Sequence, residues 1–335
     1  MTTDFALLIR DFMTRYLVAT RNVSQNTVLS YRDSYVLLLH CLNECYGLKP
    51  ENLKVQDVSP DRVKSFLEWL EEKRGCSIRT RNLRLVAIHS LFRYIAVQQP
   101  EYLFQAQQIL SIPEKKTVQT IVSYLPAADI EALLAAPNPL TTQGLRDQAM
   151  LCLLYDSGCR VQELCDITIG DVSLGSVATV RLHGKGNKYR TVVVSDATAK
   201  LVGNYLSRYR SYAVGTDFLI TNRYHRKIDR DGISYIIKKY VDEIRKEDAT
   251  FPEHVHCHMF RHSKAMHMLE AGINIVYIRD FLGHEDISTT MIYVRADNRL
   301  KNDAINALAP KVTDETNLPD WNKDKDLLQF LNSLK

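Results

Sequence analysis

The chain has 335 residues, of which 45% are hydrophobic and 24% are charged, values typical of a globular protein with a substantial core. At roughly 100–200 residues per domain, this length predicts two domains. The longest apolar run has seven residues (149–155), far fewer than the roughly 20 that span a bilayer, and the N-terminus carries no secretory pattern. The net charge of +4 permits nucleic-acid binding without requiring it, and seven cysteines without a Cys-x-x-Cys pair favour a reducing compartment. We expect a soluble cytoplasmic protein with no membrane partner.

Residues 1–110 are predicted to be entirely helical. Apolar residues recur at helical spacing, for example in residues 85–92, and Pro50, Pro60 and Pro100 separate the periodic stretches. Ser24 and Ser59 precede two of these stretches and are expected to cap helices. We therefore expect one helical domain, followed at 111–124 by a polar linker.

The second half combines helices with a short sheet. Helices are predicted over 127–136 and 144–157, near Lys200, and over 232–246, 258–270 and 274–282, the last two ending at Gly272 and Gly283. The β-branched runs 177–182 and 189–194 predict a hairpin. We expect a mainly α fold with a small antiparallel β-sheet in a domain spanning 125–310. A tail over 311–335 contains Trp321 and an apolar set that predicts one short amphipathic helix.

Common catalytic motifs are absent from the sequence. It has no phosphate-binding loop, no Gly-x-Gly-x-x-Gly, no His-Glu-x-x-His and no Gly-x-Ser-x-Gly. Several histidines lie close together around Cys257, which raises the possibility of zinc, but the usual paired spacing of zinc ligands is missing. We expect no metal site.

Two segments of the second half carry cations with ambiguous roles. Arg160 precedes Glu163 by three residues, so its guanidinium is either held in place by that carboxylate or part of a surface ion pair of little energy. The predicted hairpin tip 184–188 carries Lys185 and Lys188. Such a tip is either a solvated turn or a flexible site for contact with a phosphate.

Three further segments add groups that can bind or transfer protons. His258 and Arg261 share one helix face, where the arginine can fork onto a phosphate and the histidine can move a proton. We expect this pair at the exposed N-terminal end of its helix. His284 follows a helix stop. Tyr293 becomes a nucleophile only if charge is supplied around it; otherwise it is a core residue.

Taken together, the segments resemble the tyrosine recombinase (phage integrase) family. The resemblance rests on residues 157–164, 184–190, 258–263, 282–284 and 288–293, which occur in the family's order. Their separations also match, with 25 residues from Arg160 to Lys185, 26 from His258 to His284 and nine from His284 to Tyr293. A looser resemblance covers residues 24–33 and 77–94. It implies a helical SAM-like core-binding domain before a mixed α/β catalytic domain.

The resemblance also implies a site and a reaction. The implied catalytic residues are Arg160, Lys185, His258, Arg261, His284 and Tyr293. The two arginines and His284 would hold the phosphate oxygens while Tyr293 attacks phosphorus. Lys185 would protonate the leaving 5′ oxygen, and His258 would position Tyr293 or assist its deprotonation. Energy is conserved in the phosphotyrosine, so no metal, ATP or other cofactor is expected.

The implied partner is duplex DNA with inverted-repeat binding sites. The residues expected to contact it are Thr27, Tyr31, Arg32, Arg79, Arg81, Arg84 and Lys188. The alternative for the basic helix over 77–94 is an ordinary solvated face. The resemblance further implies four protomers on synapsed DNA and a monomer or weak oligomer when free. We predict that the tail docks on a neighbouring protomer when DNA is synapsed, and docking on its own catalytic domain is the alternative.

Several functions are compatible with these residues. We favour an integrase or transposase of a mobile element, acting through a 3′-phosphotyrosine and a Holliday junction. A chromosome-dimer-resolving Xer-type recombinase and a type IB topoisomerase-like enzyme are the alternatives within the class. A non-catalytic DNA-binding regulator is the alternative outside it, but DNA binding alone would not require all six catalytic residues.

Overall fold

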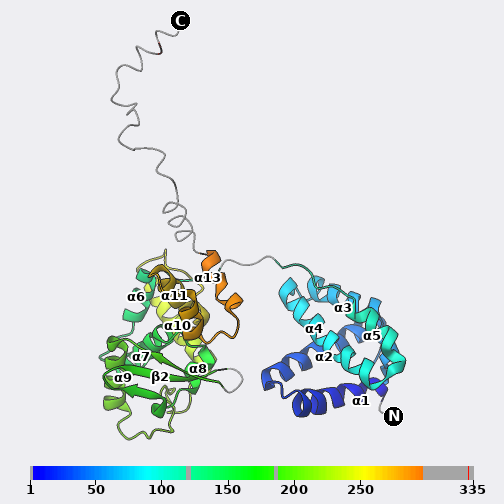
Figure 1. Ribbon diagram of the computed structural model, residues 1–335, viewed down its shortest axis with the longest axis horizontal. Helices are drawn as coiled ribbons and strands as arrows, with labels where there is room; N and C mark the ends of the chain where they lie inside the picture. The colour runs from blue at the N-terminus through cyan, green and yellow to red at the C-terminus, as the bar shows by residue number, and fades with distance from the viewer. Residues whose placement is uncertain (1–2, 118–121, 185–187, 297–330, 332–335) are drawn as a thin grey trace. The chain divides into compact units, whose positions relative to one another are not determined.

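The computed structural model describes residues 3–117, 122–184, 188–296 and 331. The chain divides into two compact units, Met1–Thr120 and Ile121–Lys335, each with its own core (Figure 1). Lys185 and, apart from Leu331, the tail over 311–335 lie outside the described residues. Within those described ranges, no helix is long and apolar enough to cross a membrane.

The first unit is built from helices, as the sequence predicts. Among its described residues, α-helices alternate with π-helical (η1) and 3₁₀-helical (η2–η4) segments: α1 (Asp4–Asp11), η1 (Phe12–Thr20), α2 (Gln25–Tyr46), η2 (Pro50–Asn52), η3 (Val55–Asp57), α3 (Pro60–Glu72), α4 (Ile78–Gln98), η4 (Pro100–Tyr102) and α5 (Leu103–Leu110). The predicted caps are confirmed, because the Ser24 and Ser59 side chains accept hydrogen bonds from N–H groups in the first turns of α2 and α3.

Helix α4 is the central packing element of this unit. It contacts α2, α3 and α5, and its residues Leu85, Ile88 and Phe92 are fully buried in the shared core. The helical periodicity in the sequence thus identified the buried face.

The second unit packs helices against one face of a small sheet. Its helical elements are α6 (Ala127–Ala135), α7 (Thr142–Asp156), α8 (Val161–Asp166), η5 (Ile169–Asp171), α9 (Asp196–Tyr209), α10 (Arg230–Ile244), α11 (Cys257–Glu270), α12 (Ile275–Leu282), η6 (Ile287–Thr289) and α13 (Met291–Ala296). Strands β1 (Val172–Leu174), β2 (Ala178–His183) and β3 (Tyr189–Val193) form an antiparallel sheet in that order. The hairpin is confirmed. Strand β1 was not predicted, because three residues are too few to show alternation.

The β2–β3 hairpin packs one face on the core of the second unit and also contacts α8. Val180, Leu182 and Val192 are buried in the same core as α7, while the residues between them face away. Val180 pairs with Val192 and His183 with Tyr189, so the chain reverses between residues 183 and 189. Strand β2 also packs against α8, which begins directly after Arg160.

Helix α11 organises the rest of the unit. It contacts α6, α7, α10, α12 and α13, and it lies among these helices in Figure 1. The predicted glycine stops are confirmed at its end and at the end of α12, since Gly272 and Gly283 have φ values of +78° and +66°. The turn at Gly283 directs the chain back from α12 toward α11.

Candidate active site

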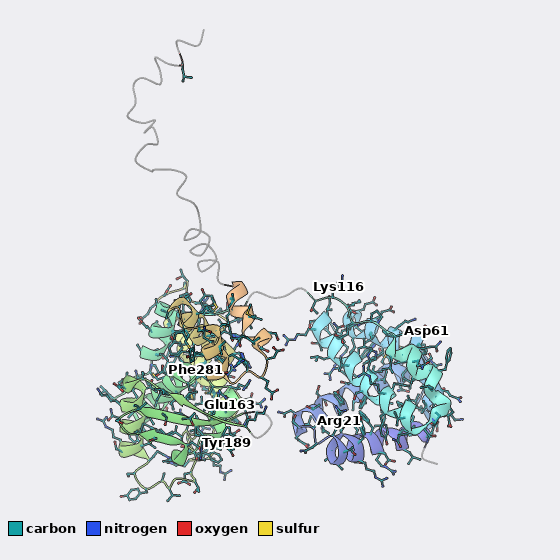
Figure 2. The ribbon with its side chains drawn as sticks, viewed as in Figure 1. Arg21, Asp61, Lys116, Glu163, Tyr189 and Phe281 are labelled. Atoms are coloured by element: carbon teal, nitrogen blue, oxygen red, sulfur yellow. The ribbon has the colours of Figure 1, made fainter. Side chains whose placement is uncertain are left out.

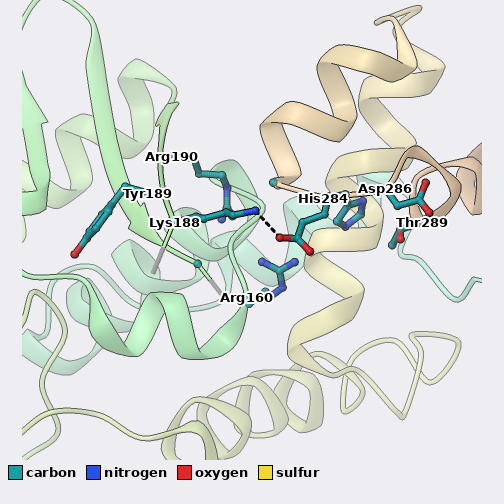
Figure 3. Close-up of a pocket in the computed structure, with 10 residues that line it drawn as sticks. Arg160, Lys188, Tyr189, Arg190, His284, Asp286 and Thr289 are labelled. Carbon is teal, nitrogen blue, oxygen red and sulfur yellow. Dashed lines mark hydrogen bonds and ion pairs between the residues drawn. The ribbon is translucent and has the colours of Figure 1, made fainter. Parts of the chain in front are cut away.

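A pocket of about 470 Å³ opens between the β2–β3 hairpin and the loop that follows α12. Figure 3 shows Lys188 and Arg190 on one wall, His284, Asp286 and Thr289 on the other, and Arg160 between them. The sequence segments around Arg160, the hairpin and His284 therefore meet in space. The described part of the chain holds no group of three or more His, Cys, Asp or Glu side chains arranged for a metal ion.

A buried carboxylate holds two of the pocket's arginines. Glu163 is 4% exposed, and its Oε1 accepts a 2.7 Å hydrogen bond from Nη1 of Arg160. Arg190 donates to both oxygens of the same carboxylate, at 3.0 and 2.8 Å. Burial alone would raise the pKa of Glu163, but the bonds from Arg190 and from the backbone N–H of Arg160 lower it to about 2. The interpretation of Arg160 and Glu163 as a surface pair is therefore wrong.

Arg190 ties this carboxylate to the loop that carries His284. Its Nε donates to the carbonyl oxygen of Phe281 at 3.1 Å, and its side chain packs closely under Gly283. Figure 2 shows Phe281, Glu163 and Tyr189 following one another along one side of the second unit. Arg190 was not among the predicted site residues. Its place two residues after Lys188, on a strand whose register points it inward, is the signal that could have identified it.

Arg261 is buried, which differs from the exposed helix end expected for it. The residue is 3% exposed, and its guanidinium donates to the carbonyl oxygens of Gly158 and Leu282, both at 2.7 Å. Burial, followed by the positive charges of Arg160 and Arg190, lowers its pKa to about 10. The cause of the burial is the packing of α12 across α11, which a helix periodicity does not reveal. Three guanidinium groups thus share one region with a single buried carboxylate, an arrangement that attracts an anion.

His284 follows the Gly283 turn and faces the same pocket. Its Nδ1 lies 2.9 Å from Oγ1 of Thr290. Burial and then the positive charges of Arg261, Arg160 and Arg190 lower its pKa to about 4. The imidazole is therefore neutral at pH 7 in this structure. A phosphate bound between the arginines would offset their charge and raise the pKa of His284.

Tyr293 lies on α13 with its side chain 1% exposed. Its hydroxyl oxygen is 2.9 Å from Nδ1 of His262 on α11. Burial raises the pKa of Tyr293, an effect that the positive charges of Arg261 and Arg160 only partly offset. His258 was expected to assist Tyr293, but it is exposed, and its ring stacks on that of His262 with 6.1 Å between centroids. The sequence signal for His262 was its spacing of four residues from His258, which places both on one helix face.

Two lysines of the hairpin were also predicted to contribute to the site. Lys185 lies outside the described residues. Lys188 is exposed at the pocket mouth and forms a 2.6 Å ion pair with Glu285 (Figure 3).

The DNA-contact residues predicted in the first unit also separate into exposed and packed side chains. Arg32 and Arg79 are exposed, Thr27 and Arg84 are partly buried, and Tyr31 stacks on Phe12. Arg81 differs from the expectation: it is 6% exposed, and its guanidinium donates to Asn82 at 3.0 Å and to the carbonyl oxygen of Pro113 at 3.3 Å. The segment after α5 returns to α4 and covers this side chain. In this structure Arg81 is a packing residue rather than part of a solvated basic face.

Both units match family models. Residues 123–299 match the phage integrase family, and residues 11–99 match its N-terminal SAM-like domain. The chain is 33% identical over 332 residues to "Putative integrase/recombinase y4rC" of Sinorhizobium fredii, covering 99% of this chain and 98% of that protein. It is 34% identical over 286 residues to tyrosine recombinase XerD of Yersinia pestis, covering 84% and 90% of the two chains.

Solved structures share the fold. XerH site-specific recombinase bound to a palindromic difH substrate aligns with a TM-score of 0.68 at 20% identity, covering 85% of this chain and 81% of that one. The Tn1549 transposon integrase in complex with transposon right end DNA aligns with a TM-score of 0.64 at 18% identity, covering 91% and 98%.

The mostly helical fold, its small antiparallel sheet and these matches define the class: the chain belongs to the phage integrase family. Within that class it is a DNA-binding tyrosine recombinase, an enzyme of site-specific DNA recombination.

Proposed function

We propose that the protein cuts and rejoins duplex DNA through a covalent 3′-phosphotyrosine formed by Tyr293, and that strand exchange passes through a Holliday junction. The observation that carries the proposal is the convergence of Arg160, Arg261 and His284 beside a tyrosine hydroxyl hydrogen-bonded to a histidine. Preorganised cations at that position stabilise the charge that grows on a phosphate during transfer.

Each proposed residue has a distinct task. Arg160 and Arg261 bind the non-bridging phosphate oxygens, and His284 adds a third donor. Their positions are fixed before DNA binds by Glu163, by two backbone carbonyl groups and by Thr290, so little reorganisation accompanies the reaction. Lys185 protonates the departing 5′ oxygen, and His258 packs against the histidine that contacts Tyr293.

We further propose that four protomers act in the cytoplasm on two duplexes with inverted-repeat sites. XerH and the Tn1549 integrase, which share this fold, are described in complexes with DNA. We favour a mobile-element role. Chromosome-dimer resolution is the second candidate, supported by relatives named XerD that match more than four fifths of this chain. Sequencing the joints of DNA recombined by the protein separates the two, since a mobile element yields junctions between element ends and target DNA, whereas dimer resolution rejoins two copies of one chromosomal site.

The experiment that tests the covalent step uses a nicked duplex from which the short downstream fragment, carrying the new 5′-hydroxyl, diffuses away after cleavage. Wild-type protein is expected to accumulate a DNA adduct that survives denaturation. Nuclease and protease digestion followed by mass spectrometry is expected to place the nucleotide on the peptide containing Tyr293. A protein that binds this DNA but forms no adduct would contradict the proposed function.

The different exposure of Arg79 and Arg81 on α4 gives a prediction about DNA binding. Arg79 is exposed, so Arg79→Ala is expected to lower the slope of log affinity against log salt concentration by roughly one unit if it contacts a phosphate. Arg81→Ala serves as the matched control on the same helix, because its guanidinium is buried. It is expected to leave the salt slope unchanged and to destabilise the first unit by about 1–3 kcal/mol. Fluorescence anisotropy across a salt series measures the slopes, and equal slopes for wild type and Arg79→Ala would remove Arg79 from the interface.

A further inference from the structure

Helix α11 makes two hydrogen bonds of the same kind to tyrosines from other elements. Nδ1 of His262 lies 2.9 Å from the hydroxyl of Tyr293, and Nδ1 of His267 lies 2.9 Å from the hydroxyl of Tyr155. Both histidines are partly buried, and they are five positions apart in the sequence. The two pairs differ in their surroundings, because only the Tyr293 pair lies beside Arg160 and Arg261.

We propose that His262 is the catalytic residue that accepts the proton of Tyr293 when the tyrosine attacks DNA. This inference rests on the proposed function and assigns a step in it. The O–H bond of Tyr293 breaks as an N–H bond forms at Nδ1 of His262, and the released oxygen electron pair forms the bond to phosphorus. The bond between phosphorus and the 5′ oxygen breaks, and that oxygen takes a proton from Lys185. Atoms and charge balance without any further reactant.

The geometry favours His262 over His258 for this task. A general base must lie within hydrogen-bond reach of the proton it removes, and among the described residues His262 meets that condition. His258 is exposed and contacts the ring of His262 rather than Tyr293. Its contribution is therefore to orient His262, as a positioning residue.

The protonation states are compatible with a base that acts only when DNA is present. Burial, then the charges of His258, Arg261 and His256, lower the pKa of His262 to about 4, so its imidazole is neutral and Nδ1 can accept a proton at pH 7. The pKa of Tyr293 is raised, so the proton stays on the tyrosine in the free protein. A phosphate between Arg160 and Arg261 would offset the positive charge near both groups. It would raise the pKa of His262 and make it a stronger base as the substrate arrives.

The test compares His262→Gln with His267→Gln on the nicked duplex. Glutamine retains a hydrogen-bonding side chain but cannot accept a proton near neutral pH. We expect His262→Gln to slow adduct formation by about 100-fold or more at pH 7, with DNA affinity unchanged. We expect His267→Gln, which makes the same change at an equivalent tyrosine bond on the same helix, to form the adduct at the wild-type rate.

The pH profile separates a proton acceptor from a structural contact. His262 has a pKa of about 4 in the free protein and is therefore already neutral at pH 6, so the wild-type rate is expected to rise much less than tenfold per pH unit from pH 6 to 8. Without it, hydroxide removes the tyrosine proton, and the His262→Gln rate is expected to rise about tenfold per pH unit. A substrate with sulfur in place of the 5′ oxygen has a leaving group that needs no proton. It is therefore expected to restore adduct formation by a Lys185 variant but not by His262→Gln.

Distinct outcomes would overturn the inference. A wild-type rate for His262→Gln, or an equal loss in both glutamine variants, would remove His262 as the base while leaving the proposed function intact. Failure of wild-type protein to form any adduct would instead contradict the proposed function. If His262→Gln does not fold, His262→Ala with added imidazole replaces it, and absence of rescue in that folded variant would also contradict the proposal.

Discussion

Tyr293→Phe is expected to abolish the covalent DNA adduct while retaining DNA binding. The substitution removes one oxygen atom and keeps the ring that packs against α11. Without the hydroxyl there is no atom to attack phosphorus, so the loss is complete rather than partial. DNA affinity is expected to stay within about twofold, because phosphate contacts by arginine and lysine dominate binding.

Denaturing gels of the nicked duplex measure the adduct, and anisotropy at fixed salt measures binding. The lost bond to His262 is expected to lower stability by about 1 kcal/mol. Tyr155→Phe is the matched control, since it breaks the bond to His267 and should leave the adduct intact. An adduct formed by Tyr293→Phe would show that another residue is the nucleophile.

Glu163→Gln is expected to produce the largest loss of stability among substitutions at the pocket. The carboxylate is 4% exposed and partly offsets the charges of the guanidinium groups of Arg160 and Arg190, to which it is hydrogen-bonded. An uncharged amide would leave both groups, and the nearby Arg261, without their shared counter-charge. Removing one partner from a buried ionic cluster destabilises by about 3–5 kcal/mol. Denaturant unfolding of the full chain measures this loss, and the first unit's transition should not move.

The same carboxylate predicts how stability responds to acid. The folded-state pKa of Glu163 is about 2, below the value near 4.3 of an unfolded chain. Its contribution of about 3 kcal/mol is therefore fully present above about pH 5 and is lost as pH falls through 2. Glu163→Gln is expected to make the free energy of unfolding less dependent on pH between about pH 5 and pH 2. Glu285→Gln is the control, because its ion pair with Lys188 is exposed and should contribute little. Similar effects of the two substitutions would contradict the conclusion that the buried carboxylate of Glu163 stabilises the arginines of the pocket.

Much of the secondary structure was predictable because it depends on local patterns. The buried residues of α4 recur at helical spacing, and the serine caps and glycine stops act within one turn of the helices they end. The hairpin was predictable from two β-branched runs joined by a glycine-rich turn. Strand β1 was missed, since its position depends on pairing with β2 rather than on its own three residues.

The sequence alone determined the family, through the order and spacing of short polar segments around Arg160, Arg261, His284 and Tyr293. Those segments can be recognised in the sequence because a phosphate-transfer site requires particular side chains within short stretches of chain. Tertiary packing decided which of two nearby candidate residues makes a given contact. His258 and His262 share a helix face, and the position of α13 brings Tyr293 to His262. Likewise Arg79 and Arg81 lie on one basic helix, but the chain returning at Pro113 buries only Arg81. A helical pattern defines which residues share a face, whereas contacts between segments distant in sequence define what each residue on that face touches.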